Sequence, residues 1–284
     1  MAVVATGFFD GVHLGHRKVI ETLLECAAGR GEQSLVLTLW PHPRTVLQKD
    51  ARDLRLLTSM EEKRRLLMDM GVDEIVVLPF TKEFAAMTAE QYLRSIVIER
   101  FGASAMVLGY DNRLGSDMLD PERTSALAAG LGLDVIRCGS AGDFSSTRIR
   151  RALSEGDIEA AESMLGYPYQ MHGVVVSGNR LGHTIGFPTA NIKLYEPLKL
   201  IPSAGAYLTE VVVQSRTYYG MTNIDFAGKI ETHIFDFSED IYGLDIELDF
   251  LSRIRGEQEF QSLQELKIQL EKDQEYCKNL IFGI

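Results

Sequence analysis

The sequence predicts an α/β protein: an N-terminal unit with a parallel sheet, followed by a small antiparallel β-barrel with a C-terminal helix. The first half alternates short apolar runs with helical patterns, which is typical of a parallel sheet covered by helices. The second half has short β-rich runs separated by Gly, Asn, Ser and Asp, without helices between them. A chain of 284 residues accommodates two cores. We therefore expect domains at residues 1–166 and 167–284.

Five runs of the first half have the pattern of strands and four have the pattern of helices. Thr88 and Pro121 are typical helix-start residues. Residues 147–154 and 157–165 are expected to form helices that bridge the domains. The expected strands are 2–6, 34–39, 74–79, 105–108 and 133–137, and the expected helices are 17–28, 61–70, 89–101 and 121–129. Ligands bind such sheets at the carboxyl ends of strands.

The second half predicts a barrel with a helix at its end. Leucines at helical spacing in residues 263–280 predict a helix that covers the barrel. The expected barrel strands are 171–176, 206–213, 218–224, 231–235 and 245–251.

The composition describes an acidic protein of ordinary hydrophobicity. The formal net charge is −11 and 45% of the residues are hydrophobic. Neither half is basic, which argues against broad nucleic-acid binding, although nucleotides can still bind through local donors and Mg²⁺. No apolar run approaches the ~20 residues that span a bilayer, so we expect no membrane partner. Three scattered cysteines fit a reducing cytoplasm, which is the expected location.

The residues after the first expected strand, Gly7 to His16, read Gly-Phe-Phe-Asp-Gly-Val-His-Leu-Gly-His. A helix begins there, and its free N–H groups and dipole favour phosphate. Gly11 and Gly15 let the backbone approach a ligand. His13 and His16 can donate N–H bonds and stabilise developing charge. The alternatives are a surface turn and a metal site, which no nearby Cys or third His completes. We favour nucleotide chemistry.

Two further segments of the first half are candidates for ligand contacts. Gly109 and Asp111 follow the expected strand 105–108. Ser146 and Thr147 open a helix with Arg150 in its first turn, a second possible phosphate grip, although Ser146 fits an ordinary N-cap equally well. Earlier in the chain, Trp-Pro-His-Pro at 40–43 follows the second expected strand and is either the cover of a planar ligand or a rigid connector.

A glycine-rich segment at 178–191 is the main signature of the second half. It contains Gly178, Gly182 and Gly186, and its Thr189 and Asn191 could coordinate Mg²⁺ or touch phosphate. It lacks the Gly-Lys-Ser/Thr of a Walker loop. A flexible hairpin loop is the alternative, but the Phe-Pro pair at 187–188 implies a defined shape.

The strand expected at 231–235 supplies a candidate general base. Glu231, His233 and Phe235 alternate, so they share one face. Glu231 could accept a hydroxyl proton near neutral pH. From its spacing alone, a solvated strand carboxylate is the simpler interpretation.

Taken together, these motifs resemble the bacterial bifunctional riboflavin kinase/FAD synthetase (FMN adenylyltransferase) family over nearly the whole chain. Residues 7–16 are similar to the adenylyltransferase signature of the HxGH nucleotidylyltransferases, and 109–111 and 145–150 to later nucleotide-binding motifs. Residues 186–191 resemble the riboflavin kinase signature, which is far more specific than HxGH. Residues 231–233 resemble the strand that carries the catalytic carboxylate.

The resemblance implies a Rossmann-like nucleotidylyltransferase domain, a riboflavin kinase barrel and two reactions. The barrel would phosphorylate riboflavin from ATP to give FMN, with Glu231 as base and Thr189 and Asn191 holding Mg²⁺. The first domain would then transfer AMP from ATP to FMN, giving FAD and pyrophosphate, with His13 and His16 stabilising charge at the α-phosphate.

The resemblance also implies which residues contact nucleotide and phosphate. Ser146, Thr147 and Arg150 would hold the outgoing phosphates. The other implied contacts are Gly7, Phe9, Asp10, Gly11, Gly15, Gly109, Asp111, Gly178, Gly182 and Gly186. The loop at 225–229 is shorter than the family's. One alternative is therefore an adenylyltransferase whose barrel only binds or senses flavin; another is a flavin sensor without enzyme activity.

Overall fold

The computed structural model describes residues 1–48, 51–139, 142–178 and 181–283. The chain forms two compact units, Met1–Ser146 and Thr147–Ile284. Helices α7 (Ser146–Glu155) and α8 (Ile158–Leu165) thus group almost wholly with the second unit. The domain boundary expected after residue 166 stays a prediction.

The first unit is built on a parallel sheet, as predicted. Within the described residues the sheet has five strands in the order β3-β2-β1-β4-β5, and every neighbouring pair is parallel. The chain leaves β1 for one side of the sheet and later reaches β4 on the other side, so the crevice beyond β1 and β4 is the expected ligand position. The strands are β1 (Ala2–Thr6), β2 (Gln33–Trp40), β3 (Glu74–Pro79), β4 (Ala103–Leu108) and β5 (Asp134–Arg137).

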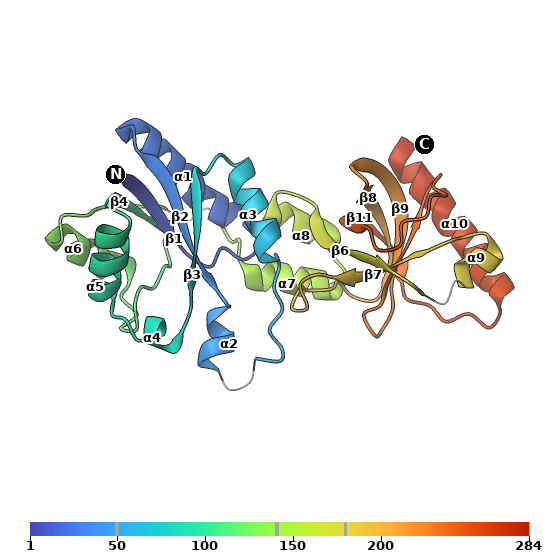
Figure 1. Ribbon diagram of the computed structural model, residues 1–284. Coiled ribbons are helices and arrows are strands. Elements are labelled where there is room, and N and C mark those ends of the chain that lie inside the picture. The colour runs from blue at the N-terminus through green and yellow to red at the C-terminus, as the bar shows by residue number, and fades with distance from the viewer. Residues whose placement is uncertain (49–50, 140–141, 179–180, 284) are drawn as a thin grey trace. The chain divides into compact units, whose positions relative to one another are not determined.

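Helices cover both faces of this sheet (Figure 1). On one face α1 (Leu14–Arg30) and α3 (Met60–Asp69) pack on the strands. The other face carries α5 (Ala89–Gln91), its π-helical continuation η1 (Tyr92–Arg100), and α6 (Pro121–Gly130). Two short helices, α2 (Pro43–Leu47) and α4 (Lys82–Ala85), were not predicted.

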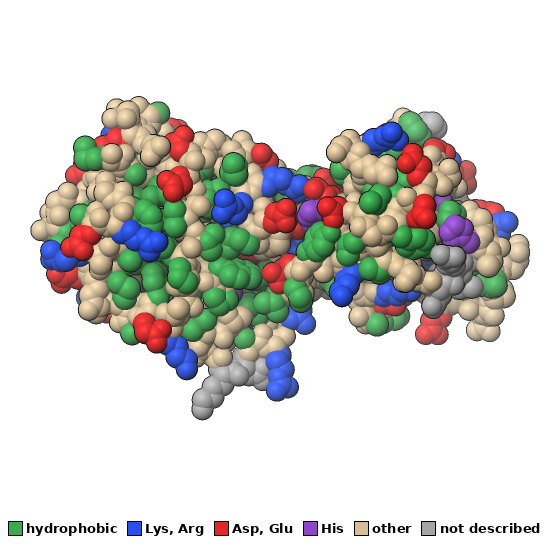
Figure 2. All heavy atoms as spheres, in the orientation of Figure 1, with side chains coloured by type: hydrophobic (Ala, Val, Ile, Leu, Met, Phe, Trp, Pro, Cys, Tyr) green, Lys and Arg blue, Asp and Glu red, His purple; other side chains and the backbone are tan. Residues whose placement is uncertain are grey.

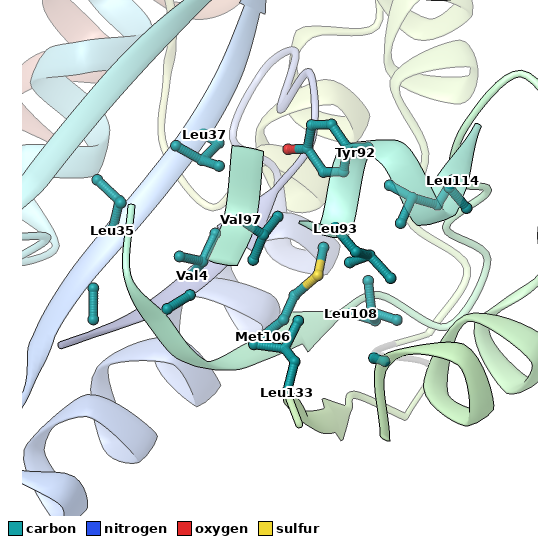
Figure 3. Close-up of a cluster of buried hydrophobic side chains, with 14 of the residues drawn as sticks. Val4, Leu35, Leu37, Tyr92, Leu93, Val97, Met106, Leu108, Leu114 and Leu133 are labelled. Atoms are coloured by element: carbon teal, nitrogen blue, oxygen red, sulfur yellow. The ribbon is translucent and has the colours of Figure 1, made fainter. Parts of the chain in front are cut away.

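The core explains why the strands of the first unit are apolar throughout. Figure 3 shows the cluster on one face, where Val4 and Met106 of the central strands meet Leu93 and Val97 of η1. Strands that are buried on both faces cannot alternate polar with apolar residues. Each fully buried side chain of this size stabilises the fold by roughly 1.5–3 kcal/mol.

The second unit is a closed antiparallel barrel, which confirms the predicted class. Within the described residues six strands close it in the order β10-β7-β6-β11-β8-β9. The strands are β6 (Tyr169–Val176), β7 (Ala190–Leu194), β8 (Gly205–Val213), β9 (Arg216–Ile224), β10 (Ile230–Ile234) and β11 (Asp245–Gly256). The segment expected as a loop at 178–191 instead contains helix α9 (Leu181–Ile185) and the start of β7, while its residues 179–180 lie outside the described part.

Helix α10 (Leu263–Phe282) packs on the barrel as predicted (Figure 1). Cys277 lies in an apolar cluster with Leu208 and Met221 of the barrel. A largely covered ion pair adds to this contact, since Arg255 donates to the buried Asp273 Oδ2 from Nε at 2.9 Å and from Nη2 at 2.8 Å. Burial, together with the Asp273 charge, raises the pKa of Cys277 to about 12.

We expect Asp273→Ala to destabilise the second unit by about 3–5 kcal/mol, because it leaves the largely covered Arg255 charge without its buried partner. Urea unfolding of the full chain measures the change. Glu271→Ala is the matched control, since the Glu271–Lys267 pair on the same helix is exposed and should contribute below about 0.5 kcal/mol. Equal effects of both substitutions would contradict the assignment of α10 as a helix held by this pair.

Candidate functional site

The first candidate site is the turn between β1 and α1, at the predicted crevice. Three residues of this turn have left-handed backbone conformations, Phe9 with φ 51°, Gly11 with φ 83° and Val12 with φ 36°. A β-branched residue such as valine rarely adopts a positive φ, and it does so only where the surroundings impose it. The turn is therefore held in shape by contacts from elsewhere in the unit.

Those contacts converge on Asp10, which is 4% exposed. Its carboxylate accepts the backbone N–H groups of Leu57 at 3.0 Å and Thr58 at 3.2 Å. The Gly11 N–H donates to Thr58 Oγ1 at 3.1 Å, and Ser146 Oγ donates to the Asp10 carbonyl at 2.9 Å. The Asp10 carboxylate thus ties the turn to the backbone at residues 57–58, and its role in this structure is to hold the turn in shape.

The two histidines of the turn stack on each other. Their ring centroids are 3.7 Å apart and the planes lie 16° from parallel. His13 caps α1, because its Nδ1 accepts the His16 backbone N–H at 3.3 Å. The proton of a neutral His13 ring therefore resides on Nε2. Gly15 leaves room for this arrangement, since a Cβ there would lie 3.1 Å from the His13 ring.

His16 is held as a neutral imidazole. Burial lowers its pKa well below the usual 6.5, and the charges of His13 and Lys63 lower it further. Its Nδ1 is buried and has no hydrogen-bond partner among the described residues. A buried ring nitrogen without a partner is expensive, which is typical of a group that meets its partner only in a ligand complex.

The remaining candidates of the first unit lie around the same sheet edge. Gly109 directly follows β4, and Asp111 beyond it is exposed. Asn112 was not predicted, yet its Nδ2 donates to the Thr6 carbonyl at 3.1 Å and ties the two strand ends together. A Cβ on Gly7 would lie 3.0 Å from the Phe9 ring, so a side chain there would require this ring to shift.

The residues at 146–150 that are expected to bind phosphate do not all belong to the same unit. Ser146 contacts the histidine turn within the first unit. Thr147 and Arg150 belong to the part of α7 that groups with the second unit, so their place at the site stays a prediction. The segment at 40–43 reaches the turn through ring contact, because His42 packs edge-on against Phe8 with centroids 4.3 Å apart.

The second candidate site lies on the outer face of the barrel, where Asn191 and Glu231 are opposite each other on β7 and β10. Directly opposed side chains of neighbouring strands lie within contact distance. Asn191 is 6% exposed, and its Oδ1 is buried without a hydrogen-bond partner among the described residues. A Cβ on Gly178 would come within 2.1 Å of Asn191 Nδ2, so this glycine makes room for the amide. Glu231 Oε1 accepts from Lys229 Nζ at 2.7 Å.

Two residues that sequence reasoning missed extend this polar row. Asn223 of β9 lies opposite Glu231 on the side away from Asn191. Glu257 reaches the same row through a side-chain hydrogen bond to Asn223. Burial raises the pKa of Glu257, the charges of Asp225 and Glu231 raise it further, and the Asn223 bond acts in the opposite direction. A single Asn within a β pattern gives no signal of this role.

A pocket of about 730 Å³ is lined by Ala190 and Thr232, the strand neighbours of Asn191 and Glu231. Thr189 lines the pocket, whereas Asn191, two residues later, faces Glu231. The Phe-Pro pair at 187–188 comes just before Thr189. His233 holds this pair in position, because its Nδ1 donates to the Pro188 carbonyl at 2.8 Å. Burial lowers the pKa of His233. Residues 237–242, also missed by sequence reasoning, form the other wall of this pocket.

The glycines of the barrel motif shape its backbone. A Cβ on Gly182 would lie 2.1 Å from the Phe187 carbonyl oxygen, so the helix α9 can approach the Phe-Pro segment only with glycine at this position. Gly186 has φ 90°, a conformation that glycine adopts readily. These two residues therefore support the site through backbone geometry.

Comparison with known proteins matches both units to named families. The FAD synthetase family matches residues 1–150 and the riboflavin kinase family matches residues 165–281. The bifunctional riboflavin kinase/FMN adenylyltransferase of Listeria monocytogenes is 36% identical over 96% of this chain and 90% of its own length. The Bacillus subtilis enzyme of the same name is 34% identical over 98% and 93%. A solved Streptococcus pneumoniae structure, named as a macrolide-efflux protein, has a TM-score of 0.87 and 32% identity, covering 98% of this chain and 94% of its own.

The fold and the two sites define a nucleotide-dependent transferase with a nucleotidylyltransferase unit and a kinase barrel. More specifically, the chain belongs to the bifunctional riboflavin kinase/FMN adenylyltransferase family, which confirms the family predicted from the sequence.

Its described residues include no helix that is long and apolar enough to cross a membrane. On the face seen in Figure 2, basic side chains are interspersed with acidic ones.

Proposed function

We propose that the chain makes FMN from riboflavin and ATP in the barrel, and FAD from FMN and ATP at the histidine turn. Family membership supports both activities. We assign one reaction to each of two sites because of one observation. Each site contains a buried polar atom that lacks a hydrogen-bond partner among the described residues: His16 Nδ1 at the histidine turn and Asn191 Oδ1 in the barrel.

In the barrel, Glu231 is the general base that accepts the proton of the riboflavin 5′-hydroxyl. The hydroxyl oxygen attacks the γ-phosphorus of ATP, the bond from that phosphorus to the β–γ bridging oxygen breaks, and ADP leaves. The pocket beside Thr189 takes the nucleotide, while the neighbouring outer face takes the flavin chain. Lys229 orients the Glu231 carboxylate through its ion pair.

Mg²⁺ fits the residues that we assign to it. Asn191 Oδ1 is a buried oxygen without a partner among the described residues, and the Thr189 hydroxyl belongs to the same short segment. Oxygen ligands of this kind are those that Mg²⁺ prefers alongside phosphates and waters. When bound, the ion neutralises phosphate charge. Thr189 and Asn191 would hold it between the pocket and Glu231.

At the histidine turn, an oxygen of the FMN phosphate attacks the α-phosphorus of a second ATP and pyrophosphate leaves. No covalent enzyme intermediate is needed, because the phosphate of FMN is itself the nucleophile. His13 and the neutral His16 donate N–H bonds to the α-phosphate oxygens, whose charge they stabilise in the transition state. Ser146, Thr147 and Arg150 hold the departing pyrophosphate. We propose that both reactions use only small-molecule substrates and take place in the cytoplasm.

Product analysis tests this function. Purified protein is incubated with riboflavin, ATP and Mg²⁺, and the flavins are separated by chromatography. Both FMN and FAD are expected. FAD formed from added FMN but never from riboflavin would indicate that the barrel only binds or senses flavin. Flavin binding without any ATP consumption would overturn both enzyme assignments.

Replacing Asn191 by Ala should raise the Mg²⁺ concentration needed for half-maximal FMN formation by about 10-fold, because one ligand oxygen is lost. The measurement is a Mg²⁺ titration of riboflavin phosphorylation at saturating ATP. The exposed Asn279 of α10 provides a control, since Asn279→Ala should leave the titration unchanged. An unchanged Mg²⁺ midpoint in the Asn191 variant would remove this residue from the metal site.

A further inference from the structure

Lys63 is a buried cation beside the histidine turn that none of the sequence motifs includes. It lies on α3 and is 1% exposed, whereas the next residue, Arg64, is exposed. Its Nζ donates to the Phe8 carbonyl at 2.5 Å and lies 3.8 Å from the centre of the Phe8 ring. Lysine is almost never fully buried, because removing its charge from water is costly. Its position therefore requires an explanation.

The turn that Lys63 contacts is the strained one. Phe9, Gly11 and Val12, just after the Phe8 carbonyl, have positive φ angles. The segment 57–63 holds this turn at three points: the Phe8 carbonyl, the Asp10 carboxylate and the Gly11 N–H. Backbone strain persists only where such contacts over-determine the conformation.

We propose that Lys63 is a positioning residue for adenylyl transfer: its buried ammonium group holds the Phe8 carbonyl and so fixes the turn that presents His13 and His16. This inference rests on the proposed role of the histidine turn. Lys63 touches no reacting atom in this scheme. It acts through the backbone of the turn, where an error of about 1 Å in a catalytic group can cost about 10²-fold in rate.

Electrostatics gives this role a distinct pH dependence. The titratable groups that interact with Lys63 from other elements are Asp10 of the turn and His16 of α1. On its own helix, Glu62 accepts the Ser59 backbone N–H at 2.8 Å in the capping box. Burial lowers the pKa of Lys63 to about 8, although the Asp10 charge acts against this shift.

The direction of the pH effect follows from the charge of Lys63. Below about pH 8 the ammonium is protonated and attracts both the Phe8 carbonyl and the Asp10 carboxylate. As the pH rises through about 8, the charge is lost and the turn is held less firmly. The rate of FAD formation should therefore decline on the alkaline side of about pH 8.

The test compares Lys63→Met with Arg64→Met, which removes the exposed neighbouring charge from the same helix. FAD formation from added FMN is measured from about pH 6.5 to about pH 9.5, with riboflavin phosphorylation by the same chain as the reference. We expect the Lys63 variant to lose about 10- to 100-fold in kcat at pH 7, with KM for ATP and FMN little changed, and to lack the alkaline decline. The Arg64 variant should behave as the unmodified protein.

The other outcomes are separable. An unmodified protein that makes no FAD overturns the proposed function itself. A Lys63 variant with normal kcat, or with a reduced kcat but an unaltered alkaline decline, overturns the positioning role. Where the variant does not fold, an NMR titration of the unmodified protein labelled with ¹³C-lysine tests the proposal. One lysine with a pKa near 8, together with the alkaline decline in FAD formation, supports it. Lysines that all titrate near their usual pKa overturn it.

Discussion

His16→Ala should lower the rate of FAD formation from added FMN by about 10²–10³-fold, while riboflavin phosphorylation by the same chain is unchanged. In the proposed reaction this imidazole donates to the α-phosphate oxygens, so the substitution removes a donor that stabilises their developing charge. Burial already holds this imidazole neutral and in place, so the native protein has little reorganisation to make during the reaction. The substitution deletes that preorganised group.

The two activities of one chain provide the control for this experiment. The kinase site lies in a separate unit, so an equal loss of both activities would indicate misfolding or a wrong assignment of sites. A pH profile adds a second check. Because the pKa of His16 lies well below 6.5, it stays neutral as pH falls from 8 toward 6.5, and its titration should not reduce FAD formation in that range. A steep fall centred near 6.5 would contradict the neutral-imidazole role.

The parallel sheet and its ligand-binding edge could be predicted because their signals are local. Buried strands such as Ala2–Thr6 and Glu74–Pro79 are short apolar runs whose bounds the structure reproduces. The sheet edge follows from strand direction alone, and the motif that contains His13 and His16 is predicted to lie there because it follows the first strand. The barrel was predictable as a class for the same reason, since its strands are separated by turn residues.

What could not be predicted depends on contacts between distant residues. The sequence predicts a loop where β7 begins, because Gly186 and Pro188 just before this strand are residues typical of turns. Lys63 resembles any surface lysine in sequence, and only the fold places it against Phe8, 55 positions earlier. Asn223 comes to lie opposite Glu231 through strand register, which sequence periodicity does not provide.

Glu231→Gln should reverse the pattern expected for His16. FMN formation should fall by about 10²–10⁴-fold, because the amide cannot accept the hydroxyl proton during attack, while FAD formation from added FMN continues. The amide has nearly the same size, so its packing beside Asn191 and Asn223 is retained. Separate assays with riboflavin and with FMN as the flavin substrate measure the two rates.

Glu247→Gln is the matched control, because Glu247 is also a partly exposed carboxylate on the outer face of a barrel strand, with His172 Nε2 3.8 Å away. It should leave both rates within about twofold, since a single long ion pair at the protein surface contributes little. If both substitutions reduced FMN formation equally, the effect would be one of surface charge and Glu231 would not be the base. If neither did, proton removal from riboflavin would not depend on the Asn191–Glu231 pair. A selective loss in the Glu231 variant alone therefore ties the phosphoryl transfer to this one strand position.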